Sequence, residues 1–440
     1  MIAVALPALM AAFGVGVAGV SWIVTVYLVT MAGLQPVAGK LGDLYGHRRL
    51  FLIGCGGLAS ASVACALAPT FPLLVAGRAL QAVFAATMAP NGAAIIRHRA
   101  LPDSRGRAFG WLAGWMTFGA AIGPAMAGVL VHRLGWASIF WVNLPVLALV
   151  IPLAFRMLPE TPRQSGGGFD GGGAILLTLT LTGGVVALAG VANGGSGPLI
   201  AAGISILLGL TLYEWERRQS SPMIDFRLFR HPAFAGASAA VMLTNLAMYT
   251  TLLLVPLFMA GLQGRGATAI GWVLVVYSGL MSLVSPLGGY LSDRLGPVGP
   301  VVAGTVLLLA GTGLLLQADA RMSLLTLIVF LALGAAGLGL QMAAQQSAAL
   351  ESAPAEMAGA ANGVWATARY LGSIAGTVLL GVLVGDTLDS TGFRNMLYAV
   401  SAACCVLLPV GTVLRLSGRP IGLLAAKVTP TSEGLPGQSG

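Results

Sequence analysis

Residues 110–128 read GWLAGWMTFGAAIGPAMAG, and residues 363–381 read GVWATARYLGSIAGTVLLG. The two stretches share four glycines at a constant offset of 253 residues, which pairs Gly110, Gly119, Gly123 and Gly128 with Gly363, Gly372, Gly376 and Gly381. A second echo has an offset of 250 residues and pairs Gly39, Asp43 and Gly46 with Gly289, Asp293 and Gly296. Four matches at one offset are hard to obtain by chance, even with 62 glycines. The chain therefore contains two related halves.

The composition indicates that both halves are built for lipid. Of the 440 residues, 57% are hydrophobic and 8% are charged, whereas soluble domains carry about 25% charged residues. An aqueous globule could not cover this much apolar surface, so the sequence predicts an all-α membrane protein. Parallel repeats of membrane helices are typical of transporters that bind their substrate between the halves.

Apolar runs of roughly 20 residues mark the expected spans. One short helix at the start is followed by Val20–Val37, Leu50–Leu67, Pro72–Ile96, Ala108–Val131, Ser138–Met157, Ala174–Ala192, Leu199–Tyr213, Ala233–Gly261, Ala269–Leu291, Val298–Leu316, Met322–Leu350, Ala358–Val384 and Arg394–Leu414. These are about fourteen spans, arranged as two pseudo-symmetric six-helix bundles with two inserted central helices. We expect a first bundle in residues 1–163, a linker with the inserted helices in 164–232, a second bundle in 233–416 and a disordered cytoplasmic tail in 417–440.

Lysine and arginine separate by side of the membrane. Alternate loops and the tail hold 17 of the 23 basic residues, the opposite loops hold four, and Arg78 and Arg369 fall inside spans. The positive-inside rule places the 17 and both termini in the cytoplasm. This distribution also explains the net charge of +9 without a nucleic-acid partner.

The residues give no indication of catalysis or of a cofactor. The four cysteines lie in apolar runs without CxxC spacing, and the four histidines are scattered in loops. No metal site is predicted, and a membrane-embedded enzyme is disfavoured because no catalytic set converges in a span.

Gly39–Leu50 reads GKLGDLYGHRRL and lies between two expected spans. Glycine permits a tight turn, and Asp43 can cap the next helix or pair with an arginine across the two halves. The stretch resembles the signature loop between helices 2 and 3 of the major facilitator superfamily, with a second copy, GYLSDRLG, at Gly289–Gly296; Leu44 departs from the family's usual basic residue. The resemblance implies a gating loop formed by Gly39, Asp43, Gly46, Arg48, Arg49, Gly289, Asp293 and Arg294. The alternative is a capped turn with snorkelling arginines.

Arg78 and Gln81, in the run RALQ, lie about 10 Å inside the fourth span. A charge at that depth costs a few kcal/mol and is a functional candidate by default. The run resembles the family's RxxQG motif, with Ala82 in place of glycine, which implies a role in proton transfer. The alternative is an arginine that snorkels outward.

Gly119, Gly123, Pro124 and Gly128 resemble the GxxxGPxxGG helix motif of exporters in the superfamily, the antiporter branch. Trp136–Pro145, WASIFWVNLP, is similar to the same branch. The surroundings of Arg369 resemble the fourteen-helix drug:proton antiporters, which makes Arg369 a coupling candidate beside Arg78 and Gln81. Glycines four residues apart let helix backbones touch, and proline introduces a kink. Small-residue packing without antiport is the alternative.

A proton-coupled antiporter needs a titratable acid in the membrane, and all 14 acidic residues fall in loops or at span ends. Met1–Pro7, MIAVALP, resembles the second half of the family's first-helix motif, whose aspartate would precede Met1. We therefore expect a first helix of about a dozen residues, and a native protein that starts upstream. The alternative is that Met1–Gly19 spans unaided.

The sequence thus predicts a multidrug-type exporter of small lipophilic compounds in the plasma (inner) membrane. It would work as a monomer by alternating access, in exchange for protons. Polar groups that could face the substrate cavity are Asn245, Tyr249, Gln341, Gln345 and Arg369. Each could instead join helices. Export of an endogenous metabolite, lipid or siderophore is a second possibility, and a membrane sensor without transport is a third.

Overall fold

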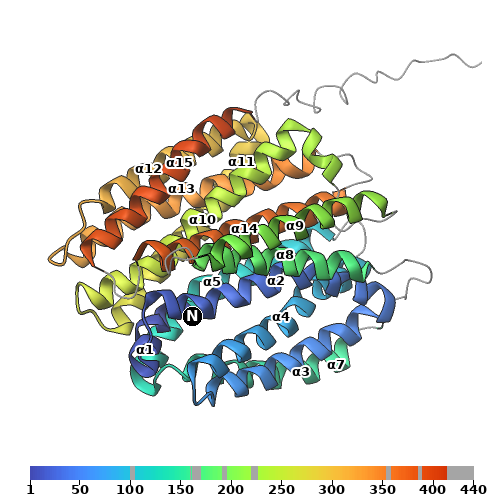
Figure 1. The fold of residues 1–440 in the computed structure, drawn as a ribbon, viewed down its shortest axis with the longest axis horizontal. Helices are drawn as coiled ribbons and strands as arrows, with labels where there is room; N and C mark the ends of the chain where they lie inside the picture. The colour runs from blue at the N-terminus through green and yellow to red at the C-terminus, as the bar shows by residue number, and fades with distance from the viewer. Residues whose placement is uncertain are drawn as a thin grey trace, which may run out of the picture.

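The computed structural model describes residues 1–99, 105–158, 160, 170–190, 196–219, 226–352, 358–384 and 389–413. The regular structure of these residues is entirely helical, as the composition predicted. Figure 1 shows the helices as a bundle of long, roughly aligned rods.

The first half begins with α1, whose 12 residues match the short first helix expected from the sequence. Its helices are α1 (Ile2–Phe13), α2 (Val17–Tyr45), α3 (His47–Ala66), α4 (Phe71–Arg99), α5 (Arg105–Leu134), α6 (Ser138–Trp141) and α7 (Asn143–Met157). The expected span Ser138–Met157 is interrupted at Val142, which separates the short α6 from α7.

The inserted pair and the second half follow. The inserted pair consists of α8 (Gly171–Gly190) and α9 (Gly197–Arg218), and a 3-10 turn, η3 (Phe226–Arg230), leads to the second half. The second half consists of α10 (Pro232–Gly261), α11 (Ala267–Leu295), α12 (Val298–Leu315), α13 (Leu324–Glu351), α14 (Ala358–Val384) and α15 (Ser390–Val413).

The packing of the second half repeats that of the first. Helix α4 packs against α2 and α3, and correspondingly α13 packs against α11 and α12. Between the halves, α5 packs against α11, and α14 packs against α2. We call these two lines of contact the α5–α11 seam and the α2–α14 seam. A large apolar core, to which α1, α2, α10 and α14 contribute, continues through both halves.

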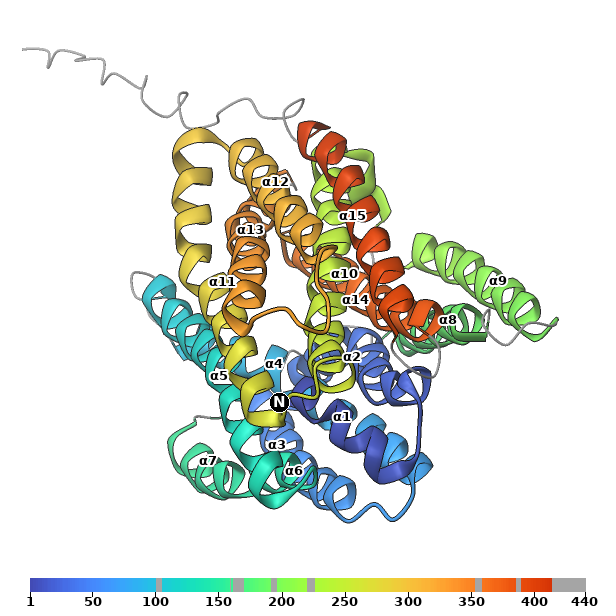
Figure 2. The same cartoon turned by 90° about the vertical axis from the view of Figure 1, so that its left-hand side faces the viewer.

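The inserted pair lies beside one seam only. Helix α8 packs against α9, α2 and α14. The approach to α2 is close, since a Cβ atom at Gly33 would lie 2.3 Å from Oγ1 of Thr178. Figure 2 shows α8 and α9 to the side of α2 and α14, away from α5 and α11.

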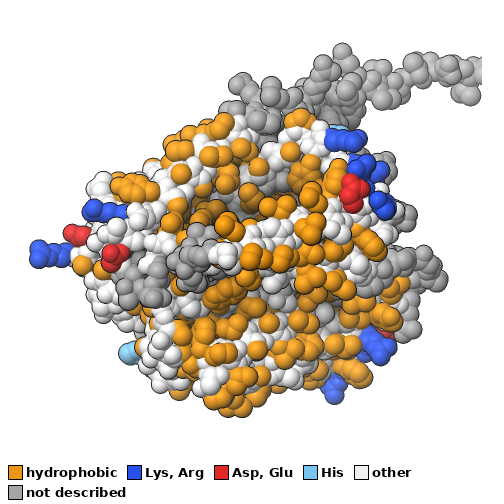
Figure 3. All heavy atoms as spheres, viewed as in Figure 1, with side chains coloured by type: hydrophobic (Ala, Val, Ile, Leu, Met, Phe, Trp, Pro, Cys, Tyr) orange, Lys and Arg blue, Asp and Glu red, His pale blue; other side chains and the backbone are white. Residues whose placement is uncertain are grey.

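The outer surface has the character of a membrane protein. Among the described residues, eleven helical segments are long and apolar enough to cross a membrane. Three more apolar segments, Ile2–Phe13, Ile122–Leu134 and Gly171–Ala187, are shorter. Figure 3 shows apolar side chains over the middle of the molecule, with charged side chains gathered at its two ends. The total of fourteen spans stays a prediction.

The helices extend farther into the glycine-rich connections than the apolar runs predicted. The stretch Gly39–Leu50 contains the expected tight turn, and α2 continues through Tyr45 while α3 begins at His47. The chain reverses at Gly46, with φ of 98°, and at the equivalent Gly296, with φ of 81°. Positive φ at both positions explains why glycine stands there.

Candidate functional site

The halves make a close contact of two helix backbones in the α5–α11 seam. A Cβ atom at Gly128 would lie 2.8 Å from the backbone oxygen of Ala267 and 3.2 Å from Cα of Gly271. A Cβ atom at Gly271 would lie 2.7 Å from the backbone oxygen of Pro124. Any larger side chain would force the helices apart, so glycine is what permits this contact.

The α2–α14 seam repeats this contact through the equivalent residues. A Cβ atom at Gly381 would lie 3.2 Å from Oγ of Ser21 and 3.3 Å from Cα of Ala18. Gly381 is the repeat partner of Gly128, and the 250-residue offset relates Ser21 to Gly271. Farther along, Oγ1 of the buried Thr25 donates a hydrogen bond of 3.0 Å to Oγ1 of Thr377. The two seams are thus related by the offsets found in the sequence.

The other glycines of the exporter-like motif do not lie in a seam. Gly123 faces α1, where a Cβ atom would lie 3.7 Å from Cγ of Met1, and Gly119 is exposed with no neighbour within 4 Å. Pro124 lies inside the continuous helix α5. The repeat partner of Gly123, Gly376, faces α10 in the same way.

Arg78 lies inside the protein rather than snorkelling outward. Its side chain is on α4 and is 9% exposed. The guanidinium donates to Oε1 of Gln81 and, over 3.3 Å, to the backbone oxygen of Ile23. Its central carbon also lies 4.3 Å from the ring centroid of Tyr27. Gln81 in turn donates to Oγ of Ser62 over 2.8 Å, so this cluster connects α4 to α2 and α3.

Arg369 lies in the middle of α14 and is half-buried. Its guanidinium carbon lies 5.8 Å from the ring centroid of Trp365 and 5.3 Å from that of Tyr370. Tyr249 on α10 is partly buried and packs, like Tyr370, against the large apolar core. Tyr27 and Tyr370 both pack against a small apolar cluster of α2 and α4 side chains. Arg78 therefore lies beside a ring of the first half and Arg369 beside two rings of the second half, and one ring from each set contacts the same cluster.

The predicted cavity amides lie elsewhere, in a buried polar cluster of the second half. Gln341 and Gln345 on α13 are 0% exposed, and Asn245 on α10 is 1% exposed. Gln345 Nε2 donates to Oγ1 of Thr244 over 2.9 Å and to Oε1 of Gln341 over 3.1 Å, and Oγ1 of Thr305 donates to the same Oε1 over 3.4 Å. Asn245 donates to the backbone of its own helix. This arrangement is the one expected of polar residues that join helices.

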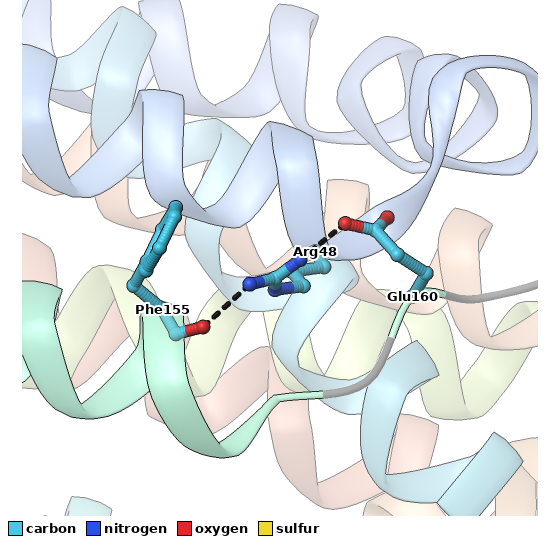
Figure 4. Close-up of polar contacts among 3 residues, drawn as sticks. All are labelled: Arg48, Phe155 and Glu160. Atoms are coloured by element: carbon cyan, nitrogen blue, oxygen red, sulfur yellow. Dashed lines mark hydrogen bonds and ion pairs between the residues drawn. The ribbon is translucent and has the colours of Figure 1, made fainter.

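Arg48 of the predicted gating loop pairs within its own half. It donates to Oε1 of Glu160 and to the backbone oxygen of Phe155, and it lies over the Phe155 ring (Figure 4). The pair fastens the start of α3 to the end of α7. Arg49 is exposed. The side chain of Asp43 lies outside the described residues.

The end of α2 packs closely on α4. Gly39 faces Pro90 of α4, and a Cβ atom at Gly42 would overlap the side chains of Asn91 and His47. Nδ1 of the buried His47 lies 2.7 Å from Oδ1 of Asn91. The sequence predicts a loop at His47 and gives no sign of Asn91, whose importance depends on a contact 44 residues away.

The second copy of the loop is similar in backbone and different in side chains. Gly289 faces Ala343 of α13, where a Cβ atom would lie 3.6 Å from the alanine Cβ. Arg294 is exposed and its guanidinium carbon lies 4.5 Å from the ring centroid of Tyr290. The side chain of Asp293, like that of Asp43, lies outside the described residues.

The carboxylate side chains that the structure describes lie at helix ends or in connections. They are Glu160, Asp170, Glu214, Glu216, Asp319 and Asp389. Glu216, in the last turn of α9, is 3% exposed, which the sequence did not predict. Asp170 accepts hydrogen bonds from the backbone of Gly173 and from Nε1 of Trp215, which ties α8 to α9. No group of three possible metal ligands occurs among the described residues.

The aromatic partners of the arginines were also missed from the sequence. Tyr27, Trp365 and Tyr370 are single aromatic residues in apolar runs. Their relevance follows only from the packing of α2 against α14. The sequence repeat could have identified Gly271 as a seam residue. It is the 250-residue counterpart of Ser21, which lies next to the seam glycine Gly381.

Comparison with known proteins agrees with this geometry. The family model described as Major Facilitator Superfamily matches residues 1–377 and 237–421. Multidrug resistance protein Stp of Mycobacterium tuberculosis (strain H37Rv) is 34% identical over 395 residues, covering 88% of this chain and 73% of its own. The tetracenomycin C resistance and export protein of Streptomyces glaucescens is 31% identical over 394 residues, covering 88% and 72%. A crystal structure of a mutant of the peptide transporter POT superposes with a TM-score of 0.66 at 16% identity, covering 91% and 87%.

Proposed function

The chain belongs to the Major Facilitator Superfamily, and on that basis we propose that it exports small lipophilic compounds by alternating access in exchange for protons. It is a multi-span membrane protein of a transporter family, with relatives named for multidrug resistance and for tetracenomycin C resistance and export. Those names describe the relatives; the proposal extends them to this chain.

The pair of glycine contacts between the halves is the observation that carries the proposal. Gly128 meets Gly271 in one seam, and Gly381 meets Ala18 in the other. Backbone contacts without interlocking side chains let one bundle tilt against the other at little steric cost. Alternating access in parallel-repeat transporters is this kind of tilting around a site between the halves.

Both contacts lie toward the same side of the proposed membrane orientation. They occur near the first residues of α2 and α11 and near the last residues of α5 and α14. The positive-inside rule assigns these ends to the outer face, with both termini in the cytoplasm. On this orientation the two halves touch at the outer side, as in a transporter that is closed to the outside.

We assign the polar candidates according to their surroundings. Arg78 and Gln81 belong to a satisfied cluster that links three helices, and we propose that they take part in proton coupling. The ends of α2 and α11, with Gly46 and Gly296 at the turns, form the proposed cytoplasmic gate. We propose Arg369, which lies beside the ring of Tyr370, and Tyr249 as the substrate contacts.

The domain boundaries and cellular setting complete the proposal. We propose bundles in residues 1–163 and 233–416, joined by residues 164–232 with the inserted pair, and a cytoplasmic tail in 417–440. The protein would act as a monomer in the plasma (inner) membrane. The basic residues of the connections on one side favour a cytoplasmic placement of that side.

Reconstitution into liposomes tests the export reaction. Purified full-length protein is placed in liposomes loaded with the neutral lipophilic dye N-phenyl-1-naphthylamine, with the pH indicator pyranine on the side to which protons are expected to move. Under an imposed pH gradient we expect dye movement above that of protein-free liposomes, together with a change in pyranine fluorescence that depends on the dye.

The two parts of the proposal have separate outcomes. No dye movement above protein-free liposomes across several unrelated lipophilic compounds would contradict export. Dye movement without a coupled pyranine signal would support export and contradict proton exchange. The matched control is Gly128→Trp, because a bulky side chain in the seam should hold the halves apart and stop transport.

Export of an endogenous metabolite is the second candidate. It is favoured by the relative from Streptomyces glaucescens, whose name joins resistance with export of tetracenomycin C. Measuring which compounds accumulate inside cells that lack this protein separates the two candidates. Accumulation of a compound the cell makes would favour a dedicated metabolite exporter over a multidrug exporter.

A further inference from the structure

Arg369 offers hydrogen-bond donors that the described protein does not use. Its guanidinium has ring faces of Trp365 and Tyr370 as neighbours. Among the described residues, no carboxylate or carbonyl group accepts a hydrogen bond from it, and its side chain is only half-buried. A guanidinium carries five N–H donors in a planar fork that matches a carboxylate.

Arg369 lies deep in the expected membrane, where an arginine without hydrogen-bond acceptors costs free energy and therefore indicates a functional role. The residue lies 11 positions after the start of the 27-residue helix α14, which is near the middle of a membrane at about 1.5 Å per residue. Charged groups at such depth are rare, face an interior or a water-filled cavity, and mark substrate or ion pathways.

Arg78 does not play the same part. Its guanidinium is already bound by Gln81, the backbone oxygen of Ile23 and the ring of Tyr27. It therefore contributes positive potential to the region, whereas Arg369 has both positive charge and donors to offer. Their aromatic neighbours Tyr27 and Tyr370 pack against one apolar cluster.

The side chains around Arg369 also indicate the chemistry of the part of a ligand that does not contact the guanidinium. Tyr370 from α14 and Tyr27 from α2 bring aromatic rings from both halves to one apolar cluster. Aromatic rings pack well against other aromatic rings and tolerate varied shapes. No carboxylate of the described chain lies in the middle of a span, so nothing there balances the charge of a cationic ligand.

Given the proposed function as an exporter, we propose that its preferred substrates are lipophilic organic anions, such as aromatic carboxylates or phenolates, bound by Arg369. The anionic oxygens accept hydrogen bonds from the guanidinium, and the apolar body lies among the tyrosine and tryptophan rings. Charge-assisted bidentate pairs of this kind are strong and geometrically specific. A lipophilic cation meets two arginines instead and is disfavoured.

A pair of fluorescent probes that differ in charge tests this inference without any substitution. The probes are 4-(1-pyrenyl)butanoate and 4-(1-pyrenyl)butylammonium, which share the ring and the linker. Binding to the full-length protein in nanodiscs is measured by equilibrium dialysis, with empty nanodiscs of the same lipid to correct for partitioning. We expect the anion to bind about tenfold more tightly, which is one decade in Kd. Equal binding, or tighter binding of the cation, would overturn the inference.

Substitution of Arg369 locates the site. Arg369→Gln should weaken binding of the anion about tenfold and leave binding of the cation unchanged or slightly stronger. Arg369→Lys keeps the charge and loses the fork, so an intermediate loss is expected. The matched control is Arg217→Gln, which removes an exposed arginine that also lies over a tyrosine ring, that of Tyr213. An unchanged anion affinity in folded Arg369→Gln would exclude this residue as the anion site.

The result is independent of the export assay. Wild-type protein that moves the neutral dye but binds both pyrene probes equally remains an exporter without anion preference. If the protein prefers the anion but moves no compound, the anion site is supported and export is contradicted. If Arg369→Gln fails to fold, the comparison of the two probes on the wild-type protein and on Arg369→Lys still decides.

Discussion

At the scale of single residues, Gly271 permits a close backbone approach between the halves. A methyl group there would lie 2.7 Å from the backbone oxygen of Pro124, and overpacking a tight contact costs roughly 1–3 kcal/mol. We expect Gly271→Ala to lower the free energy of unfolding by an amount in that range and to reduce transport several-fold. Thermal unfolding in detergent and dye flux in liposomes measure the two effects.

The control for that substitution lies on the same helix. Gly279 is also in α11, and a Cβ atom there would have no neighbour within 4 Å. Gly279→Ala should therefore leave stability and transport close to wild type. Similar losses in both variants would show that general helix properties, and not the seam contact, account for the effect.

Arg78 makes the second prediction at this scale. Its planar guanidinium stacks on Tyr27 and reaches both Ile23 and Gln81, a geometry that an ammonium group does not reproduce. We expect Arg78→Lys to insert normally and to lower transport by more than about tenfold, equivalent to roughly 1.4 kcal/mol. Arg217→Lys, at an exposed arginine over Tyr213, should have no effect. Wild-type flux in folded Arg78→Lys would remove this cluster from the mechanism.

At the scale of helices, we expect the amide cluster of α10, α12 and α13 to contribute to stability and not to substrate binding. Gln345 donates to Thr244 and Gln341, and it is fully buried. Replacing it with the similarly shaped methionine removes interhelical hydrogen bonds, which are worth about 0.6 kcal/mol on average in membrane proteins. We expect Gln345→Met to lower the midpoint of thermal unfolding slightly and to leave binding of the pyrenyl anion unchanged. A selective loss of probe binding with unchanged stability would instead make Gln345 a substrate contact.

The helices themselves were largely predictable, and the errors have physical causes. Helix α14 begins and ends where the apolar run Ala358–Val384 does. Helix α2 continues to Tyr45, eight residues past the expected end at Val37. Hydropathy marks where a segment leaves the hydrocarbon, whereas backbone hydrogen bonds continue until a residue such as Gly46 adopts positive φ. The glycine-rich end of α2 is therefore helical up to Tyr45.

At the scale of the whole molecule, opening of the α2–α14 seam should be required for transport. The side-chain oxygens of Thr25 and Thr377 are 3.0 Å apart across it. We expect a Thr25→Cys, Thr377→Cys pair, in a background that lacks the exposed Cys405, to form a disulfide on oxidation and to lose transport. Reduction should restore it, and either single cysteine should be insensitive to oxidant. Full transport by the cross-linked protein would contradict rocking at this seam.

The site was less predictable than the fold because it depends on contacts between distant segments. The repeat alone indicated the glycine contacts, since equal offsets relate Gly128 to Gly381 and Ser21 to Gly271. Arg78 and Arg369 stood out as charges within apolar runs. Their tyrosine partners did not, because Tyr27 and Tyr370 are 343 residues apart and meet only through the packing of α2 with α14.

Because of the position of α8, the two seams differ in how they are exposed to the surrounding lipid. The inserted pair flanks the seam between α2 and α14, whereas among the described helices it does not pack against α5 or α11 (Figure 2). Under the proposed export of lipophilic compounds, we expect a compound dissolved in the bilayer to enter between the halves at the α5–α11 seam, because the inserted pair flanks the other seam. Lateral entry would then come from one side of the protein.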